Sequence, residues 1–326
     1  FIAIAKEITE TDLKRICDEI KKVFELKNCS ISIGAALYPG DGNKVSDIID
    51  RADRALFAAK KKGRNCLVSY GELNDNKSSG HDMESVMKSA VKDDIDQFEV
   101  YYQPIVNNKK PNCPCEGAEA LVRWNSPELG LLLPDQFMQT AEYLGVLNAI
   151  GGHVLAHAIK RCKYWNDMGH PEYRVHINLS DSQIMSQNTA ADIKEALETS
   201  RINPANVHLE IAEHQGLQDR DQFITALAKL KELGVSLELD NFGQASSSVN
   251  SIKDFSVDGV KIDRAVIKSM DTDDFAGAML KAVIDMCKVL DVRTYAVGVE
   301  DEAQHGVVTE TGADFVQGLS LIHISE

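Results

Sequence analysis

The sequence predicts an α/β protein whose larger part is a closed (β/α)8 barrel of the TIM type. From residue 98 onward, short apolar and β-branched runs alternate with amphipathic segments, which is typical of parallel strands joined by helical crossovers. Eight strand candidates fall within about 225 residues, and this favours a closed barrel over an open sheet. Spacing alone leaves the open sheet as an alternative. Polar residues at the strand ends, described below, indicate a single site at one mouth of the barrel.

Residues 1–72 form a separate block before the barrel. Its expected elements are a strand, a helix, a strand, a helix and a strand at residues 1–5, 13–24, 30–38, 45–62 and 66–70. Thr9 and Asp12 resemble a capping box before the first helix, and Gly63 ends the second. Residues 73–94 are more polar, and we expect a linker there that runs into a short helix.

The barrel is expected over residues 95–326. Its strand candidates are Phe98–Val106, Ala118–Trp124, Arg174–Leu179, Val207–Ala212, Ser236–Asp240, Gly259–Asp263, Arg293–Val299 and Asp314–Val316. Amphipathic helical segments between them include Pro134–Met168, Gln222–Leu233 and Asp274–Leu290.

Composition narrows the class of protein. A net charge of −15 argues against binding along DNA or RNA, which needs clustered Lys and Arg. The longest apolar runs are too short to cross a bilayer. Seven cysteines in mostly regular segments indicate a reduced, cytoplasmic chain, with an upstream membrane or sensor region left open. Cys113 and Cys115 resemble a metal-binding pair, but no second pair lies nearby, so a simple loop is the expected structure.

Charged or amide side chains stand within or at the ends of successive strand candidates. They are Glu119, Asn178, Glu210, Asp240, Lys261 with Asp263, Glu300 and Gln317. A lone case would be a solvated strand end, but a parallel barrel brings such a series to one mouth. Converging carboxylates repel unless a positive charge lies among them, and oxygen ligands favour Mg²⁺ or Mn²⁺. Two such ions would support hydrolysis of a phosphodiester, with Lys261 adding a fixed positive charge.

These residues resemble a known family. Tyr101-Tyr102-Gln103-Pro104-Ile105, followed by Glu119-Ala120-Leu121-Val122-Arg123-Trp124, resembles the opening of EAL domains, which are cyclic di-GMP phosphodiesterases. The likeness continues in order through Asn178-Leu179-Ser180, Glu210-Ile211-Ala212-Glu213, Asp240-Asn241-Phe242-Gly243, Lys261-Ile262-Asp263 and Gln317-Gly318. It covers roughly residues 95–318.

The resemblance implies a role for each matching position. The implied ligands of the first metal ion, Mg²⁺ or Mn²⁺, are Glu119, Asn178, Glu210 and Asp240. The implied second-metal or water-positioning residues are Lys261, Asp263, Glu300 and Gln317. Gln103 and Arg123 resemble contacts to cyclic di-GMP, and the Arg123 guanidinium suits a phosphate. A homodimer through the EAL domain is a candidate assembly.

Residues 1–72 resemble the C-terminal half of a GGDEF domain, which has an α/β nucleotidyl-cyclase-like fold. The likeness rests on Ile31–Ala36 with Tyr38-Pro39, Ala52–Lys60 and Gly63–Asn65. Phe1 falls where the GGDEF signature would end, so no diguanylate cyclase activity is expected from this segment. Lys60 and Arg64 match phosphate contacts of that family, although cations at a helix end are an equally good explanation.

Two departures bear on hydrolysis. Asn241 stands where EAL domains usually have a second aspartate, and Val297 stands where they usually have a glutamate. Residues 244–248 also differ from the usual loop, and residues 319–326 bear little likeness to the family, which suggests a truncated domain. We therefore expect a domain that binds cyclic di-GMP and hydrolyses it to linear pGpG poorly. An active phosphodiesterase and a docking module without ligand are the alternatives.

Overall fold

The computed structural model describes residues 3–4, 10–25, 30–42, 44–61, 65–71, 83–212, 219–243, 249–270 and 274–318. Contacts between Cα atoms divide the chain into two compact units, Phe1–Gly80 and His81–Glu326. Each unit is described by itself.

The first unit is a small α/β unit. Its described elements are α1 (Glu10–Glu25), β1 (Ile33–Ala35), α2 (Val45–Lys61) and β2 (Leu67–Ser69). The two strands are parallel neighbours, with Ile33 opposite Leu67. Ala55 and Ala59 of α2 pack with Val68 in a small core. The first expected strand, over residues 1–5, lies outside the described residues except for positions 3 and 4, which are not in a strand.

The second unit contains the predicted barrel. Its strands are β3 (Phe98–Asn107), β4 (Cys115–Ser126), β6 (Arg174–Leu179), β7 (Val207–Ala212), β8 (Ser236–Phe242), β9 (Gly259–Ile262), β10 (Arg293–Val297) and β11 (Phe315–Gln317). Each neighbour pairs with the next, and β3 closes the ring by pairing with both β4 and β11. The eight-stranded closed barrel is thus confirmed, as are all eight strand candidates.

One strand runs against the expected direction. The strand β3 is antiparallel to β4 and to β11, whereas the other neighbours in the barrel are parallel. The connection from β3 to β4 spans only residues 108–114, which is too short for a helical crossover and suits a hairpin. A further short strand, β5 (Gly130–Leu132), pairs with the end of β4 outside the ring.

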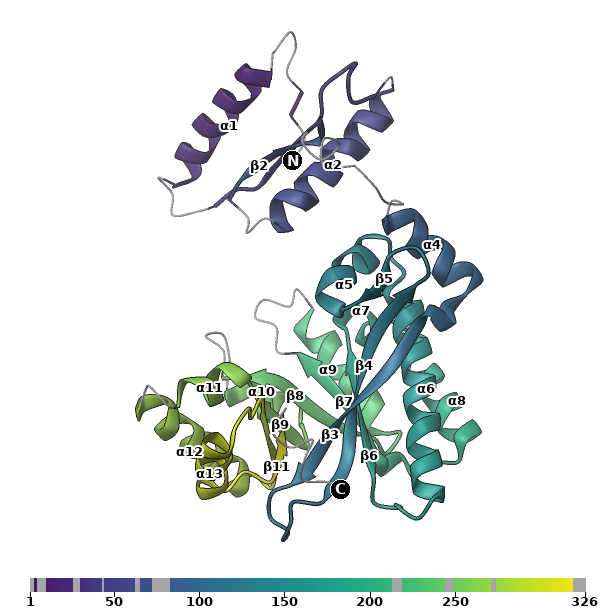
Figure 1. Ribbon diagram of the computed structural model, residues 1–326, viewed down its shortest axis with the longest axis vertical. Helices are drawn as coiled ribbons and strands as arrows, with labels where there is room; N and C mark the ends of the chain where they lie inside the picture. Colours follow the sequence, from purple (N-terminus) through teal and green to yellow (C-terminus); the bar gives the residue numbers. More distant parts are fainter. Residues whose placement is uncertain are drawn as a thin grey trace. The chain divides into compact units, whose positions relative to one another are not determined.

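Helices surround the barrel. They are α5 (Pro134–Tyr143), α6 (Leu147–Asp167), α7 (Asp181–Ile184), α8 (Thr189–Ser200), α9 (Arg220–Lys231), α10 (Val249–Asp254), α11 (Arg264–Ser269), α12 (Asp274–Val289) and α13 (Glu302–Thr311). Figure 1 shows α6 and α8 side by side next to β6. The single helical segment expected over residues 134–168 is two helices, because Gly145 adopts a left-handed conformation (φ 67°) just after α5.

Strand alternation separates an apolar outer face from a polar inner one. Ile177, Leu209, Leu237, Val260 and Ala296 are all buried in the main hydrophobic core. Each lies between two residues that point to the other face of its strand, because successive side chains alternate. Burying a side chain of this size contributes about 1.5–3 kcal/mol, so the outer face holds the barrel together and leaves the inner face for polar groups.

The helix α4 (Met83–Asp93) belongs to the second unit. We assigned this segment to the linker, with a short helix at its end, and the helix is present. Its Val86, Met87 and Ala90 are buried in a cluster that includes Phe98 and Trp124 at the barrel wall. The helix is therefore packed on the barrel unit.

Replacing Met87 by Ala tests this packing. The Met87 side chain is fully buried, so its loss should lower the free energy of unfolding by about 2–4 kcal/mol. Both tryptophans, at positions 124 and 165, lie in the second unit, so urea unfolding followed by tryptophan fluorescence reports on that unit alone. Lys88→Ala, at the exposed neighbouring position, is the control. Equal midpoints for the two variants would contradict the assignment.

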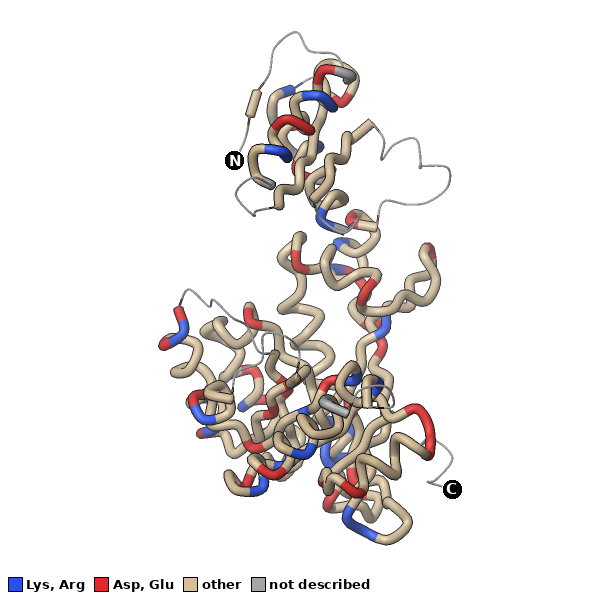
Figure 2. Tube along the Cα trace, turned by 90° about the vertical axis from the view of Figure 1, so that its left-hand side faces the viewer, with Lys and Arg blue, Asp and Glu red and all other residues tan. Residues whose placement is uncertain are grey.

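Charges of both signs are spread over the chain. Figure 2 shows blue Lys and Arg positions interspersed with red Asp and Glu positions along the trace. Among the described residues, no helix is both long and apolar enough to cross a membrane.

Candidate functional site

The carboxylate of Glu119 is the centre of a hydrogen-bonded cluster inside the barrel. Its Oε1 accepts a hydrogen bond from Asn178 Nδ2 at 2.9 Å. Its Oε2 accepts from Lys261 Nζ at 2.7 Å and from Gln317 Nε2 at 2.8 Å. These partners come from β6, β9 and β11, so strands far apart in the sequence supply one site.

Lys261 joins two acidic side chains. Its Nζ also donates to Glu210 Oε1 at 2.5 Å, and the Lys261 side chain is only 2% exposed. Burial would lower the pKa of Lys261, but Glu210 and Glu119 raise it, so the ammonium stays charged. Burial would raise the pKa of Glu119, but Lys261 lowers it to about 2. Burial and the nearby Glu119 raise the pKa of Glu210 to about 7. The single ammonium of Lys261 therefore does not offset the repulsion between the two carboxylates.

Asp240 and Asp263 complete the acidic side of the site. Burial raises the pKa of Asp240, and the charges of Glu119 and Asp263 act in the same direction. Asp263 also caps α11, because its Oδ1 accepts from the Ala265 backbone N–H at 2.7 Å. The first-metal set predicted from the sequence is therefore close together in space.

Asn241 lies in an irregularity of the strand pair. The register between β8 and β9 shifts between Leu239 and Phe242, and Asn241 has a φ of 55°. Bulges of this kind redirect side chains next to sites, and Asn tolerates a left-handed conformation well. The Asn241 Nδ2 donates to Asp240 Oδ2 at 2.6 Å. The Asn241 amide thus occupies one oxygen of a candidate ligand.

Gln317, Gln103 and Val297 lie on the other side of Glu119. Gln317 Nε2 donates to Gln103 Oε1 at 2.9 Å, and Gln103 is directly opposite Glu119 in the β3–β4 pair. Val297 is opposite Gln317 and lies two residues after the inward-pointing Tyr295, so its side chain shares that face. An apolar side chain therefore borders the site at this position.

Two predicted residues do not join this cluster. Glu300 is exposed, and its backbone N–H donates to Gln304 Oε1 at 2.8 Å. Arg123 lies over the Tyr101 ring at 5.7 Å and donates to the Val122 carbonyl. Within the part of the chain that the structure describes, neither side chain forms a hydrogen bond with Glu119 or its partners. Glu213 and residues 244–248 lie outside the described residues, as do Arg64, Gly63 and residues 319–326.

A second polar layer lies beneath the first. Glu238 Oε2 accepts from His176 Nδ1 at 2.7 Å, and its Oε1 accepts from His208 Nδ1 at 2.6 Å. All three side chains are buried, and His176 Nδ1 is 3.6 Å from Glu210 Oε1 in the upper layer. Gly259 leaves room for this layer, since a Cβ there would lie 3.1 Å from Glu238 Cγ and 2.9 Å from Tyr295 Cε2.

Burial and the neighbouring charges shift the pKa values of the three side chains in the lower layer. Burial would lower the pKa of His176, but Glu238 and Glu210 raise it to about 9. Burial lowers the pKa of His208 to about 4, against the pull of Glu238. Burial opposes the ionised form of Glu238, but the two imidazoles hold its pKa well below the usual range. The layer is thus a charged His176–Glu238 pair beside a neutral His208.

Sequence reasoning did not assign this layer, although a signal existed. His176, His208 and Glu238 each lie two residues before a predicted metal ligand of their own strand. Since strand side chains alternate, a residue two positions earlier points to the same interior. The same rule that found the upper layer could have found the lower one.

The donor set fits a divalent cation bound through oxygen. Glu210 Oε2 and Gln317 Oε1 are buried without a hydrogen-bond partner in the described structure. Unpaired buried acceptors are unfavourable unless a positive charge or donor reaches them. The other candidate ligands, Glu119 and Asp240, are also oxygen donors, as Mg²⁺ and Mn²⁺ prefer.

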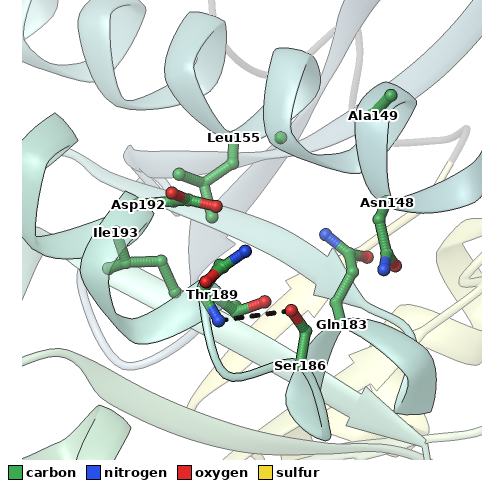
Figure 3. Close-up of a pocket in the computed structure, with 10 residues that line it drawn as sticks. Asn148, Ala149, Leu155, Gln183, Ser186, Thr189, Asp192 and Ile193 are labelled. Carbon is green, nitrogen blue, oxygen red and sulfur yellow. Dashed lines mark hydrogen bonds between the residues drawn. The ribbon is translucent and has the colours of Figure 1, made fainter.

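A cavity of about 280 Å³ lies elsewhere on the barrel unit. Figure 3 shows Asn148, Gln183, Ser186 and Asp192 around it, contributed by α6, α8 and the segment between β6 and α8. None of the predicted site residues lines this cavity. It is therefore separate from the acidic cluster.

Comparisons with known proteins agree with this arrangement. Residues 88–323 match the family described as EAL domain, and residues 2–66 match the family described as diguanylate cyclase, GGDEF domain. A bifunctional diguanylate cyclase/cyclic di-GMP phosphodiesterase, MucR of Pseudomonas aeruginosa, is 32% identical over 98% of this chain and 46% of its own length. The cyclic di-GMP phosphodiesterase PdeR of Escherichia coli is 27% identical over 98% of this chain and 49% of its own length. The chain thus spans about half the length of these relatives.

Solved structures support the same grouping. The phosphodiesterase PaMucR in complex with c-di-GMP matches with a TM-score of 0.67 and 32% identity, over 72% of this chain and 94% of that one. The EAL enzyme Bd1971, bound to cAMP and cyclic di-GMP, matches with a TM-score of 0.69 and 25% identity, over 88% of this chain and 74% of that one. With a GGDEF-like segment before its barrel, this chain belongs to the EAL domain family.

Proposed function

We propose that this protein binds cyclic di-GMP at the barrel mouth with a divalent cation, Mg²⁺ or Mn²⁺, and hydrolyses it to linear pGpG poorly. The observation that carries the proposal is the contrast within one site. The hydrogen bonds of the Glu119–Lys261–Glu210 cluster are intact, whereas we infer that Val297 and Asn241 replace carboxylates of the family on its border.

Binding is supported by the retained first-metal set and by the neighbours. Glu119, Asn178, Glu210 and Asp240 are the proposed ligands of one cation, and both matched structures described above hold cyclic di-GMP. Such an ion would polarise the phosphodiester and activate water. Gln103 and Arg123 are the proposed contacts to the dinucleotide, with Arg123 suited to a phosphate at the rim.

Poor hydrolysis is expected because carboxylates are missing at two positions on the border of the site. Lys261, Asp263, Glu300 and Gln317 are the proposed residues for the second metal and the attacking water. Val297 has no polar atom to assist them, and the Asn241 amide brings no negative charge. Loss of such a group commonly raises the barrier by about 3–5 kcal/mol, or a few orders of magnitude in rate.

The proposed domain limits are 1–72 for the GGDEF-like part, 73–94 for the linker and 95–326 for the EAL domain. A homodimer through the EAL domain is the proposed assembly.

The test measures binding and turnover on the same preparation. Calorimetry with cyclic di-GMP and Mn²⁺ should show micromolar or tighter binding, and chromatography should show little pGpG after long incubation. Glu119→Gln removes a proposed ligand and should weaken the Mn²⁺-dependent binding at least tenfold. Turnover near 1 s⁻¹, roughly the low end for ordinary enzymes, would identify an active phosphodiesterase instead. A folded protein without any binding would identify a docking module.

A further inference from the structure

A cluster of two histidines and an aspartate lies on the outside of the barrel unit. Asp96 is in η1 (Ile95–Gln97), the 3-10 turn between α4 and β3. His153 and His157 are four residues apart on α6 and therefore share one face of that helix. Each of the three side chains offers a ligand atom, and these atoms all lie within 4.8 Å of one another. The two imidazole rings are 4.1 Å apart between centroids.

One nitrogen of the His157 imidazole is engaged by the backbone. His157 Nδ1 is 3.0 Å from the carbonyl oxygen of His153, so Nδ1 must carry the proton and Nε2 keeps its lone pair. Metal-binding histidines typically donate their other nitrogen to a carbonyl or carboxylate in this way, which fixes the tautomer and the ring orientation.

We propose that Asp96, His153 and His157 form a surface site for a divalent transition-metal ion of the kind that prefers imidazole, such as Zn²⁺. Two imidazoles and a carboxylate suit Zn²⁺, Ni²⁺ or Cu²⁺, with water completing the coordination. The site differs in chemistry from the oxygen-lined mouth, which suits Mg²⁺ or Mn²⁺. Asp96 and His157 are exposed and His153 is half-buried, so an ion can reach the ligands directly from solvent.

The position of the site gives it a structural consequence. Asp96 lies three residues after the end of α4, whereas both histidines belong to α6. A bound ion would therefore tie the segment after α4 to the first long helix of the barrel. The adjoining contacts are those of the α4 cluster, in which Met87 packs with Phe98 and Ile150. Binding should thus stabilise the docking of α4 in particular.

The test is calorimetric titration of the whole chain with Zn²⁺, in wild-type protein and in the variants His153→Ala, His157→Ala and Asp96→Asn. His170→Ala, which removes an exposed imidazole elsewhere, is the matched control. We expect each of the three variants to lose one Zn²⁺ equivalent or to bind it at least about tenfold more weakly, and the control to match wild type. Cysteines and mouth carboxylates are the same in all five proteins, so only differences between proteins report on this site.

Thermal unfolding provides a second readout. Zn²⁺ should raise the melting temperature of wild type and His170→Ala more than that of the three variants, since a ligand of the native state stabilises it. Asp96→Asn leaves α6 untouched, so a weaker Zn²⁺ response in that variant cannot come from a damaged helix. Equal affinity, stoichiometry and Zn²⁺-induced shifts in all five folded proteins would overturn the proposal.

Discussion

Replacing Asn241 by Asp and Val297 by Glu together should raise the rate of cyclic di-GMP hydrolysis by about 10²- to 10³-fold. The two changes act on the same site from different strands. Val297 ends β10 opposite Gln317, on the inward face of the barrel. A glutamate there would place a carboxylate beside Gln317, whose buried Oε1 has no partner among the described residues.

The change at position 241 acts on Asp240. The Asn241 amide donates to Asp240 Oδ2 at 2.6 Å, and an aspartate at 241 cannot make that contact when ionised. It would release the Asp240 oxygen and add a negative charge for a second cation. Its backbone should fit without strain, because Asp, like Asn, tolerates the left-handed φ of 55°.

Controls separate charge from shape in this experiment. The variant with Asn241→Asp and Val297→Gln has a similar size at both positions but lacks the carboxylate at 297, and it should gain much less. Adding Glu119→Gln to the restored protein should remove the gain, since the proposed first-metal set is then incomplete. Release of linear pGpG is followed by chromatography with Mg²⁺ and with Mn²⁺. If the restored protein binds cyclic di-GMP and still gains no turnover, the cause of poor hydrolysis lies outside these two positions.

Much of the fold and the upper layer of the site could be predicted because they depend on local patterns. Apolar runs located all eight strands, and the polar residues within them located Glu119, Asn178, Glu210 and Lys261. A parallel barrel converts those sequence positions into spatial neighbours without further information. The pattern therefore carries both the fold and the site.

Other features depend on contacts that no local pattern encodes. Strand alternation places His176, His208 and Glu238 in the interior, but only the fold brings Glu238 between the two imidazoles. The helix α4 belongs to the barrel unit because Met87 and its neighbours pack in one cluster with Phe98 and Trp124. Glu300 ends a predicted strand, yet β10 stops at Val297 and leaves the Glu300 side chain exposed. In each case tertiary packing decides the outcome.

Replacing Lys261 by Met should lower the free energy of unfolding of the barrel unit by about 3–5 kcal/mol, because it leaves buried carboxylates without their counter-charge. The ammonium is the shared partner of Glu119 at 2.7 Å and Glu210 at 2.5 Å. Methionine keeps most of the apolar stem, so the loss reports on charge more than on packing. Urea unfolding followed by the fluorescence of the two tryptophans measures it.

Control variants separate the loss of the Lys261 charge from a general effect of mutation on stability. Lys281→Ala removes an exposed ammonium that pairs with Asp285 on α12, and it should leave stability unchanged. Adding Glu119→Gln to Lys261→Met removes one of the two buried carboxylates left without a counter-charge, and it should restore part of the stability. The effects of the two changes on the free energy of unfolding are then not additive. Mn²⁺ should stabilise the Lys261→Met protein if the same carboxylates bind a cation. Additive losses and no response to Mn²⁺ would mean that Lys261 acts through packing, and that the carboxylates around it are not poised to hold a metal ion.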